Sequence, residues 1–306
     1  MNILVTGGAG FIGSHIVDAL IEHGHTVFIY DDLSSGKQVN IHPEATFIQG
    51  DIRDTETLTH VFSENTFDAV FHLAAQINVR KSIDNPLFDA ETNILASLNL
   101  IHLAATRGVK KFVFSSTGGV MYGDTDMRPT PETHNEDPLS PYAIAKLSID
   151  KYLAFYQEIH GMQTISLRYG NVYGPRQNPH GEAGVVSIFL SKMLANEQPL
   201  INGDGNQGRD YIYIQDVVRA NMAALENGSA SGIYNIGTGK ETTVNEIFSL
   251  LNILVNNAFQ EIHAPAKPGE QRTSSLDATR AKKELAWQPE VSLEDGLKQT
   301  FEWFKK

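Results

Sequence analysis

The stretch TGGAGFIG at residues 6–13 decides the fold. It follows the short apolar run ILVT at 3–6 and opens a segment with helical periodicity. Its glycines, Gly7, Gly10 and Gly13, make a tight turn possible, let the backbone approach a pyrophosphate and allow the helix to pack close to the strand. The amino end of such a helix favours an anion. The stretch therefore predicts a strand, a turn and a helix that together bind a dinucleotide.

An aspartate stands where the next strand-like run ends. Asp31 follows TVFIY at 26–30 and lies 18 residues after Gly13. A carboxylate here accepts hydrogen bonds from a ribose diol and repels a 2′-phosphate, so the pattern favours NAD over NADP. Asp51 follows a third run, TFIQG at 46–50, and is either a contact on the adenine side of the cofactor or a solvated loop residue.

Composition limits the classes of function. The chain has 306 residues and a net charge of −12 at pH 7. This acidic balance argues against a nucleic-acid partner, because affinity for a phosphate backbone comes largely from clustered Lys and Arg. The absence of cysteine excludes disulfides, thiolate nucleophiles and Cys-ligated metals. No signal-like segment or apolar run of about 18 residues occurs, so we expect a cytoplasmic protein with no membrane partner.

Short apolar, β-branched runs alternate with helix-like segments through the first half of the chain. The strand-like runs are 3–6, 26–30, 46–50, 68–75, 111–116 and 164–170, and the helix-like segments are 10–23, a part of 86–107, and 141–159. Runs that are apolar on both faces are typical of parallel strands buried under helices on both sides. The expected fold class is α/β: a Rossmann-like doubly wound parallel sheet with a smaller, interleaved carboxy-terminal substrate-binding α/β domain.

The composition changes after Arg168. The segment RYGNVYGPRQNPHGEAG at 168–184 is too long and too polar for a routine connection, and long irregular loops are usually functional. Strand-like alternation returns at 209–217 and 232–238. We expect the NAD-binding domain to comprise 1–168 plus about 209–237, and the substrate-binding domain to comprise 169–208 and 238–306.

Two capping boxes mark helix starts in the second domain. Thr243 with Glu246 precedes the apolar run IFSLL, and Ser292 with Asp295 precedes an apolar stripe at positions 293, 297, 301 and 304. Both segments are therefore expected to be helices that bury one face.

A tyrosine and a lysine lie four residues apart in SPYAIAK at 140–146. Ser140 can cap a helix whose first residue is proline, which places Tyr142 and Lys146 on one helical face. By itself this spacing also fits an ordinary helix start. FSSTGG at 114–119 ends a strand-like run about twenty residues earlier, and ligands sit at the carboxyl ends of parallel strands.

Together these segments resemble the extended short-chain dehydrogenase/reductase family over essentially the whole chain. The resemblance is strongest to its UDP-glucose 4-epimerases, and the motifs that carry it, in the family's order, are TGGAGFIGSH (6–15), YDDLSSG (30–36), HLAAQ (72–76), SSTGGVMYG (115–123), SPYAIAK (140–146), RYGNVYGPRQ (168–177), RDYIYIQDV (209–217) and KPGEQRTSSLD (267–277). It implies NAD-dependent C4 epimerisation of UDP-hexoses through a transient 4-keto sugar, with NAD tightly bound and regenerated each turnover. It also implies a homodimer formed by the helices at 86–107 and 141–159.

The resemblance assigns catalysis to Thr117, Tyr142 and Lys146. Tyrosine ionises near pH 10 and is a poor base at neutrality. A lysine ammonium about 5 Å away at an effective dielectric of about 20 favours the phenolate by about 3 kcal/mol, or roughly two pKa units. We therefore expect a lowered pKa for Tyr142, reduced further by the positive nicotinamide, so that this side chain can remove the proton of a sugar hydroxyl. Thr117 holds the same oxygen, and Lys146 also binds the nicotinamide ribose.

The resemblance also assigns the residues that bind the cofactor and the substrate. The expected cofactor contacts are Gly7, Gly10, Phe11, Ile12, Gly13, Asp31, Asp32, Leu33, Ser34, Ser35, Gly36, Asp51, Ile52, Leu73, Ala74, Ala75, Gln76, Asn93, Ser115, Tyr142, Lys146 and Tyr169. The expected substrate contacts are Thr117, Gly118, Tyr142, Asn171, Val185, Val186, Arg209, Lys267, Glu270, Arg272 and Ser274.

Several positions bear on what the substrate undergoes, which sugars fit and how the phosphates are bound. Related dehydratases carry acidic residues just after the catalytic threonine, whereas this chain has Gly118 and Gly119, which favours simple return of the hydride. Ser274 stands where the family has a bulky tyrosine in glucose-restricted enzymes, so the resemblance implies room for N-acetyl sugars. Lys267 replaces the usual arginine that binds phosphate, and Arg272 is expected to compensate.

Alternative functions remain open from the sequence. UDP-glucuronate 4-epimerisation needs a cation near C6, which Arg176 or Arg80 can supply. A C4 reductase would release NAD with a net absorbance change, and a non-catalytic NAD sensor would use the same fold. No histidine lies in a metal-binding pattern, so no metal is expected.

Overall fold

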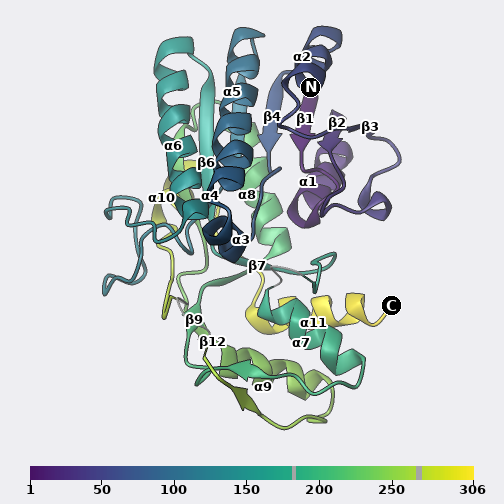
Figure 1. Cartoon of the computed structure of the whole chain (residues 1–306), viewed down its shortest axis with the longest axis vertical. Helices are drawn as coiled ribbons and strands as arrows, with labels where there is room; N and C mark the ends of the chain where they lie inside the picture. Colours follow the sequence, from purple (N-terminus) through teal and green to yellow (C-terminus); the bar gives the residue numbers. More distant parts are fainter. Residues whose placement is uncertain (181–183, 267–270) are drawn as a thin grey trace.

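The computed structural model describes residues 1–180, 184–266 and 271–306. Figure 1 shows two parts: a layered upper part that holds the amino terminus and the main sheet, and a smaller lower part that holds α7, α9 and α11. The chain passes between the two parts more than once, as the colours along the sequence show.

In the described residues the main sheet has seven parallel strands in the order β11-β6-β5-β4-β1-β2-β3. The strands are β1 (Asn2–Thr6), β2 (Thr26–Asp31), β3 (Thr46–Gln49), β4 (Ala69–His72), β5 (Lys111–Thr117), β6 (Gln163–Tyr169) and β11 (Gly232–Ile236). Central strands such as β1 and β4 are buried along nearly their whole length, as the apolar runs predict.

Helices cover both faces of this sheet. On one face lie α1 (Phe11–Glu22) and α8 (Ile214–Glu226), which pack against each other. On the other face lie α2 (Thr55–Glu64), α5 (Ala96–Thr106) and α6 (Pro141–His160). Each face has its own cluster of buried apolar side chains, so the sheet separates two cores. The predicted Rossmann-like α/β fold is confirmed.

The long helix expected within 86–107 is continuous but not uniform. It consists of α4 (Pro86–Ala90), the π-helical turn η2 (Glu91–Leu95) and α5, and the short helix α3 (Val79–Asp84) precedes it. A π-turn inside an α-helix often occurs at a functional site. Here the turn carries Asn93, whose side chain is buried.

The lower part combines small sheets and helices. Its strand pairs are β10 (Tyr211–Tyr213) with β7 (Asn171–Tyr173), β12 (Thr242–Thr243) with β9 (Gly208–Arg209), and β13 (His263–Ala264) with β8 (Ile201–Asn202). Its helices are α7 (Val185–Leu194), α9 (Val244–Leu254) and α11 (Leu293–Phe304), while α10 (Thr279–Leu285) packs on β11 and α8, and η1 (Gln38–Asn40) follows β2.

Two local predictions need correction. The strand expected over 209–217 ends at Tyr213, because α8 begins at Ile214 and buries Val217 and Val218 along one helical face. The capping box at Thr243 is complete. At Ser292 only half of one forms, because the shorter Asp295 carboxylate accepts from the serine hydroxyl at 2.7 Å rather than from its backbone.

Candidate active site

The glycine-rich turn between β1 and α1 is shaped by close contacts that a side chain would block. Gly7 has a φ of +72°, and a Cβ placed on it would lie 2.7 Å from the backbone nitrogen of Ala74. A Cβ on Gly13 would lie 2.1 Å from the carbonyl oxygen of Gly7. No side chain caps the amino end of α1, which begins with Phe11 and Ile12. The turn thus leaves backbone N–H groups and a positive helix end for an anion such as a pyrophosphate.

Asp31 lies at the end of β2 beside this turn. It is 7% exposed, and its two carboxylate oxygens accept the backbone N–H groups of Ala9, at 3.0 Å, and Leu33, at 2.9 Å. Burial raises its pKa above the usual range. Each carboxylate oxygen keeps a second lone pair for a ligand hydroxyl. The residues around Asp31 therefore fit a dinucleotide whose ribose diol reaches the end of β2.

The remaining cofactor candidates lie around the same edge of the sheet. Asp32, Leu33, Ser34, Ser35 and Gly36 form the loop after β2, where Asp32 accepts the N–H of Ser34 at 2.8 Å. Ile52 is buried, whereas Asp51 binds the guanidinium of Arg53. The carboxylate of Asp51 is therefore already paired within the protein, and the bond to Arg53 lowers its pKa.

Leu73, Ala74, Ala75 and Gln76 form the loop that leaves β4. Gln76 and Asn93 are buried and bonded to each other: the Gln76 N–H donates to Asn93 Oδ1, and Asn93 Nδ2 donates to the Gln76 carbonyl, both at 2.8 Å. Their side-chain amides also bind the Asp89 carboxylate. These bonds fix the loop at the carboxyl end of β4.

The amino end of α6 is held by two serines. Ser140 accepts the N–H of Ala143 at 3.2 Å, which is the predicted cap. Ser82 of α3 accepts the backbone N–H of Tyr142, also at 3.2 Å. The first turn that carries the tyrosine is therefore anchored both from its own chain and from a neighbouring helix.

Lys146 is 4% exposed and lies against the end of β5. Its Nζ donates to the carbonyl oxygen of Ser115 at 2.7 Å, and lies 4.5 Å from the ring centroid of Phe114 and 5.9 Å from that of Tyr142. Burial lowers the pKa of Lys146 to about 8, against the charges of Asp150 and Asp89, which raise it.

The expectation of a lowered pKa for Tyr142 is wrong for the protein alone. Burial raises the pKa of this hydroxyl, and the charge of Asp89 raises it further. The lysine ammonium is already bonded to Ser115, so the attraction expected from the sequence does not outweigh desolvation. Tyr142 therefore holds its proton in the protein without ligands.

Thr117 is the last residue of β5 and pairs in register with Tyr169 at the end of β6. The Tyr169 hydroxyl is bonded to Asn221 of α8, and the N–H of Gly118 donates to the Tyr169 carbonyl at 2.9 Å. These bonds fix the strand ends from which Thr117 projects.

A buried charge network behind these residues was not predicted from the sequence. Arg168 is fully buried and its guanidinium binds Asp150 of α6, with nitrogen–oxygen distances of 2.8 and 3.0 Å. It also donates to the Tyr122 hydroxyl at 2.9 Å and to Glu136 at 3.0 Å. The sequence offered one sign of a charged group here: Asp150 stands four residues after Lys146, one helical turn along α6.

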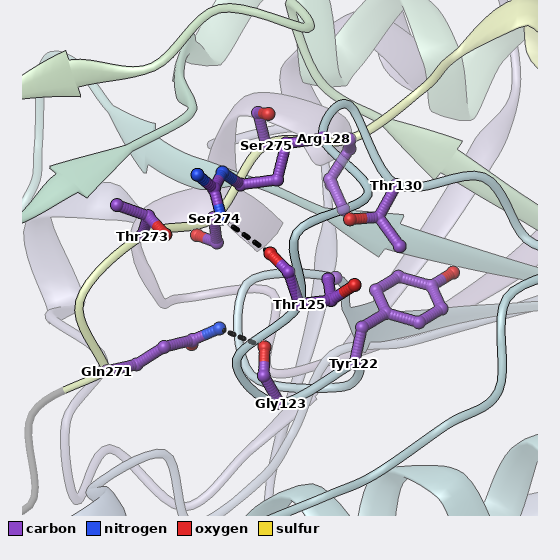
Figure 2. Close-up of a pocket in the computed structure, with 11 residues that line it drawn as sticks. Tyr122, Gly123, Thr125, Arg128, Thr130, Gln271, Thr273, Ser274 and Ser275 are labelled. Carbon is purple, nitrogen blue, oxygen red and sulfur yellow. Dashed lines mark hydrogen bonds between the residues drawn. The ribbon is translucent and has the colours of Figure 1, made fainter.

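The segment 273–276 closes a pocket against the loop that follows Thr117 (Figure 2). Ser274 is 8% exposed, and its hydroxyl oxygen is buried without a partner among the described residues. Gln271 donates to the carbonyl oxygen of Gly123 at 2.6 Å, while Arg128 donates to that of Thr125, as the dashed lines in Figure 2 show. The Leu276 side chain lies where a Cβ on Gly118 would be.

One carboxylate ties this segment to the main sheet. Asp210 is 1% exposed and accepts the N–H of Leu276 at 3.1 Å. It also accepts the N–H and hydroxyl of Thr238 and the N–H of Gly239, at 2.6 to 3.0 Å. Three segments far apart in the sequence thus meet at Asp210, a role that the sequence alone did not indicate.

The predicted diphosphate ligands differ in their surroundings. The guanidinium of Arg209 donates to backbone carbonyls at 208, 271 and 272. Arg272 is exposed and pairs with Asp204 at 3.1 Å. Lys267 and Glu270 lie outside the described residues.

The other substrate candidates lie at element ends. Asn171 begins β7, and Val185 and Val186 begin α7, whose amino end has no side-chain cap. Of the two arginines suggested for a C6 carboxylate, Arg176 pairs with Asp18 of α1 at 2.7 Å, and Arg80 is exposed on α3.

Within residues 1–180, 184–266 and 271–306, no group of three or more His, Asp or Glu side chains is arranged to hold a metal ion. No helix in these ranges is long and apolar enough to cross a membrane.

Comparisons with known proteins match this geometry. The model described as the NAD dependent epimerase/dehydratase family matches residues 3–237. The chain is similar to a solved UDP-glucose 4-epimerase with UDP-glucose from Thermotoga maritima, with 51% identity and a TM-score of 0.97, covering 100% of this chain and 99% of that one.

Two further relatives are similar over nearly their full lengths. The UDP-glucose 4-epimerase of Mycolicibacterium smegmatis is 41% identical, covering 100% of this chain and 99% of that protein. A UDP-N-acetylglucosamine 4-epimerase from Methanobrevibacter ruminantium, solved in complex with UDP-N-acetylmuramic acid, is 37% identical with a TM-score of 0.92, covering 99% of this chain and 97% of that one.

Proposed function

Because the chain belongs to the NAD dependent epimerase/dehydratase family, we propose that it is an isomerase that inverts C4 of UDP-hexoses, interconverting UDP-glucose and UDP-galactose. The observation that carries the proposal is the pairing of Tyr142 and Lys146 at the anchored start of α6, with Thr117 at the end of β5. The glycine turn and Asp31 supply the NAD site at the same edge of the sheet.

Each group at the site has a chemical task. NAD, when bound, accepts hydride from C4 and returns it, and its positive ring also favours the phenolate. Tyr142 removes the proton of the C4 hydroxyl and gives it back, with Thr117 bonded to the same oxygen. Lys146 presents its ammonium beside the tyrosine ring. Because the hydride taken from C4 would return to the opposite face of the 4-keto sugar, C4 would be inverted with no net redox change.

Elimination of water has no catalyst next to Thr117. Gly118 and Gly119 occupy the positions that follow it, and Gly118 packs against Leu276. Neither can donate or accept a side-chain proton, which supports epimerisation over dehydration. The pairing of Arg176 with Asp18 gives no support to a C6 carboxylate substrate.

We also propose that UDP-GlcNAc and UDP-GalNAc are substrates. Ser274 is a small residue in the pocket of Figure 2, and its hydroxyl lacks a partner among the described residues. An acetamido oxygen or nitrogen can supply that partner. The UDP-N-acetylglucosamine 4-epimerase that is 37% identical supports this assignment.

The test is an NMR assay of the purified protein with UDP-glucose or UDP-GlcNAc, following the anomeric signals of the C4 epimers. We expect both epimers in the wild type and a loss of about 10²- to 10⁴-fold in Tyr142→Phe. Tyr152→Phe, on the exposed face of the same helix, serves as the control and should retain activity. If no epimer forms from either sugar even with added NAD, the proposed function is wrong.

The range of sugars is tested separately. Ser274→Tyr should abolish activity on UDP-GlcNAc while UDP-glucose turnover persists, because the larger ring fills the space beside the buried hydroxyl. Equal losses on both sugars would contradict the role assigned to Ser274.

We propose further that the protein is a homodimer. An apolar stripe on α6, formed by Ile144, Phe155 and Ile159, is 49 to 61% exposed, and Leu95 of η2, a turn that packs against α6, is 61% exposed. Covering such a stripe removes apolar surface from water. Light scattering should give a dimer that Phe155→Glu dissociates, whereas Ile253→Glu on α9 leaves it intact. A wild-type monomer would contradict the proposal.

A cytoplasmic location stays a prediction.

A further inference from the structure

Asp89 is a buried carboxylate with no assigned role in the proposed C4 epimerisation. It lies on α4 and is 1% exposed. Oδ1 accepts a hydrogen bond from Gln76 Nε2 at 2.8 Å and one from Asn93 Nδ2 at 2.9 Å. Oδ2 is buried and has no partner among the described residues. A buried carboxylate with one oxygen unbonded costs folding free energy, which suggests a functional reason for its presence.

The bonds to Oδ1 orient the loop that leaves β4. Asn93 uses its amide to bind both backbone groups of Gln76, and Gln76 in turn bonds both backbone groups of Asn78. The Asp89 carboxylate selects the orientation of both amides, because it accepts from their NH₂ groups. This loop stands at the carboxyl end of a central strand, where ligands bind in this fold.

Asp89 also lies near the catalytic helix, since α4 and the π-turn pack against α6. Its charge raises the pKa of Tyr142 and that of Lys146. The other charged group that acts on Lys146 is Asp150, on α6 itself, and Asp150 is already paired with Arg168.

His72 of β4 is a further titratable group on which the ammonium acts. It is bonded to Thr6 and Ser97, and burial together with Lys146 lowers its pKa to about 3, so it is neutral. No Lys, Arg or His nitrogen within 4.0 Å pairs with Asp89 in the described part of the chain. The Lys146 ammonium acts on Asp89 through its charge and lowers the pKa of that carboxyl, against burial, which raises it.

We propose that Asp89 is a positioning residue for the epimerisation: its carboxylate orients Gln76 and Asn93 at the carboxyl end of β4 and places a negative charge beside α6, the helix that carries Tyr142 and Lys146. This inference rests on the proposed function. The catalytic lysine acts as an ammonium beside the tyrosine, and a carboxylate held near it favours that charged form.

The test uses Asp89→Asn, which keeps Oδ1 as an acceptor and removes the charge. The charge raises both pKa values, so its loss lowers both. We therefore expect both limbs of the pH profile of kcat/KM to move to lower pH, by on the order of one unit. Asp84→Asn, which neutralises an exposed carboxylate on α3, is the matched control and should move neither limb. Bound NAD, measured after denaturation, should be retained in both variants.

Loss of activity at every pH with unmoved limbs would show a merely structural role and overturn the proposal. A second readout does not depend on turnover: the NMR titration of Lys146 in protein with ¹³C-labelled lysine, assigned with Lys146→Arg. It should shift to lower pH in Asp89→Asn. An unchanged Lys146 titration overturns the inference about Asp89 even if the enzyme is active, whereas a wild type without epimerase activity overturns the proposed function instead.

Discussion

The two halves of the site are assembled in different ways. The cofactor turn is made by neighbours in sequence, because Gly7, Gly13 and the start of α1 lie within one short stretch. The sugar pocket joins segments that lie far apart, because Asp210 binds both Thr238 and Leu276. The cofactor turn therefore depends on the absence of side chains, whereas the sugar pocket depends on a few polar bonds at a buried carboxylate.

The largest effect is expected at the cofactor turn, from Gly13→Ala. Its Cβ would lie 2.1 Å from the Gly7 carbonyl oxygen, so backbone must move. We expect a loss of about 3 kcal/mol in the free energy of unfolding, together with loss of bound NAD. Denaturant unfolding and the NAD content of the purified protein measure these. Gly228→Ala, where nothing lies within 4 Å of the new Cβ, is the control.

Asp210→Ala tests the other half of the site, the sugar pocket. The change leaves the buried donor of Leu276 and the partly buried donors of Thr238 and Gly239 without their acceptor. We expect stability to fall by about 2 kcal/mol and KM for the UDP-sugar to rise, while NAD stays bound. Asp126→Ala, at an exposed loop position, is the control. Loss of NAD from Asp210→Ala would show that the two halves are not independent.

The pH dependence of activity tests the catalytic pair, Tyr142 and Lys146. The pKa of Lys146 is lowered by burial to about 8, so the ammonium is present below that pH and lost above it. Activity should therefore fall as pH rises past about 8, by roughly tenfold per unit, or about 1.4 kcal/mol. The measurement is kcat/KM against pH, with Lys151→Gln, an exposed lysine of the same helix, as the control. A flat profile from pH 7 to about 10 would contradict the need for the charge.

The smallest effect is expected from Gly118→Ala. The new Cβ would meet the end of the Leu276 side chain at 2.4 Å, and a flexible side chain can move where the backbone at Gly7 cannot. We expect KM for the UDP-sugar to rise a few-fold, equivalent to less than about 1 kcal/mol, with stability nearly unchanged. A loss as large as that of Gly13→Ala would remove the distinction between a backbone and a side-chain contact.

Much of the fold follows from local patterns. The apolar runs predicted each strand of the main sheet, because central strands that are buried on both faces need apolar residues at nearly every position. The strand predicted over 209–217 was too long, because Ile214 and Val217 are apolar residues that fit a strand but belong to the buried face of α8. Such short apolar runs do not distinguish a strand from a buried helix.

The candidate site was predictable where chemistry follows from spacing. Tyr142 and Lys146 share a helical face, and Ser140 caps the helix as expected. The sign of the Tyr142 pKa was not predictable, because burial and Asp89, which lies 53 residues earlier, outweigh the nearby lysine. Desolvation depends on what packs around a group, and spacing along one helix does not show that.

The sequence by itself determined the glycine turn, the capped start of α6 and the alternation that builds the sheet, since these depend on backbone sterics and on periods of a few residues. Only the tertiary structure decided what surrounds each buried charge: Asp150 meets Arg168, Asp210 meets the loop at 238, and Asp89 meets the side-chain amides of Gln76 and Asn93. The physical reason is that a buried charge is stabilised by whatever surrounds it in space, and those neighbours come from distant parts of the chain.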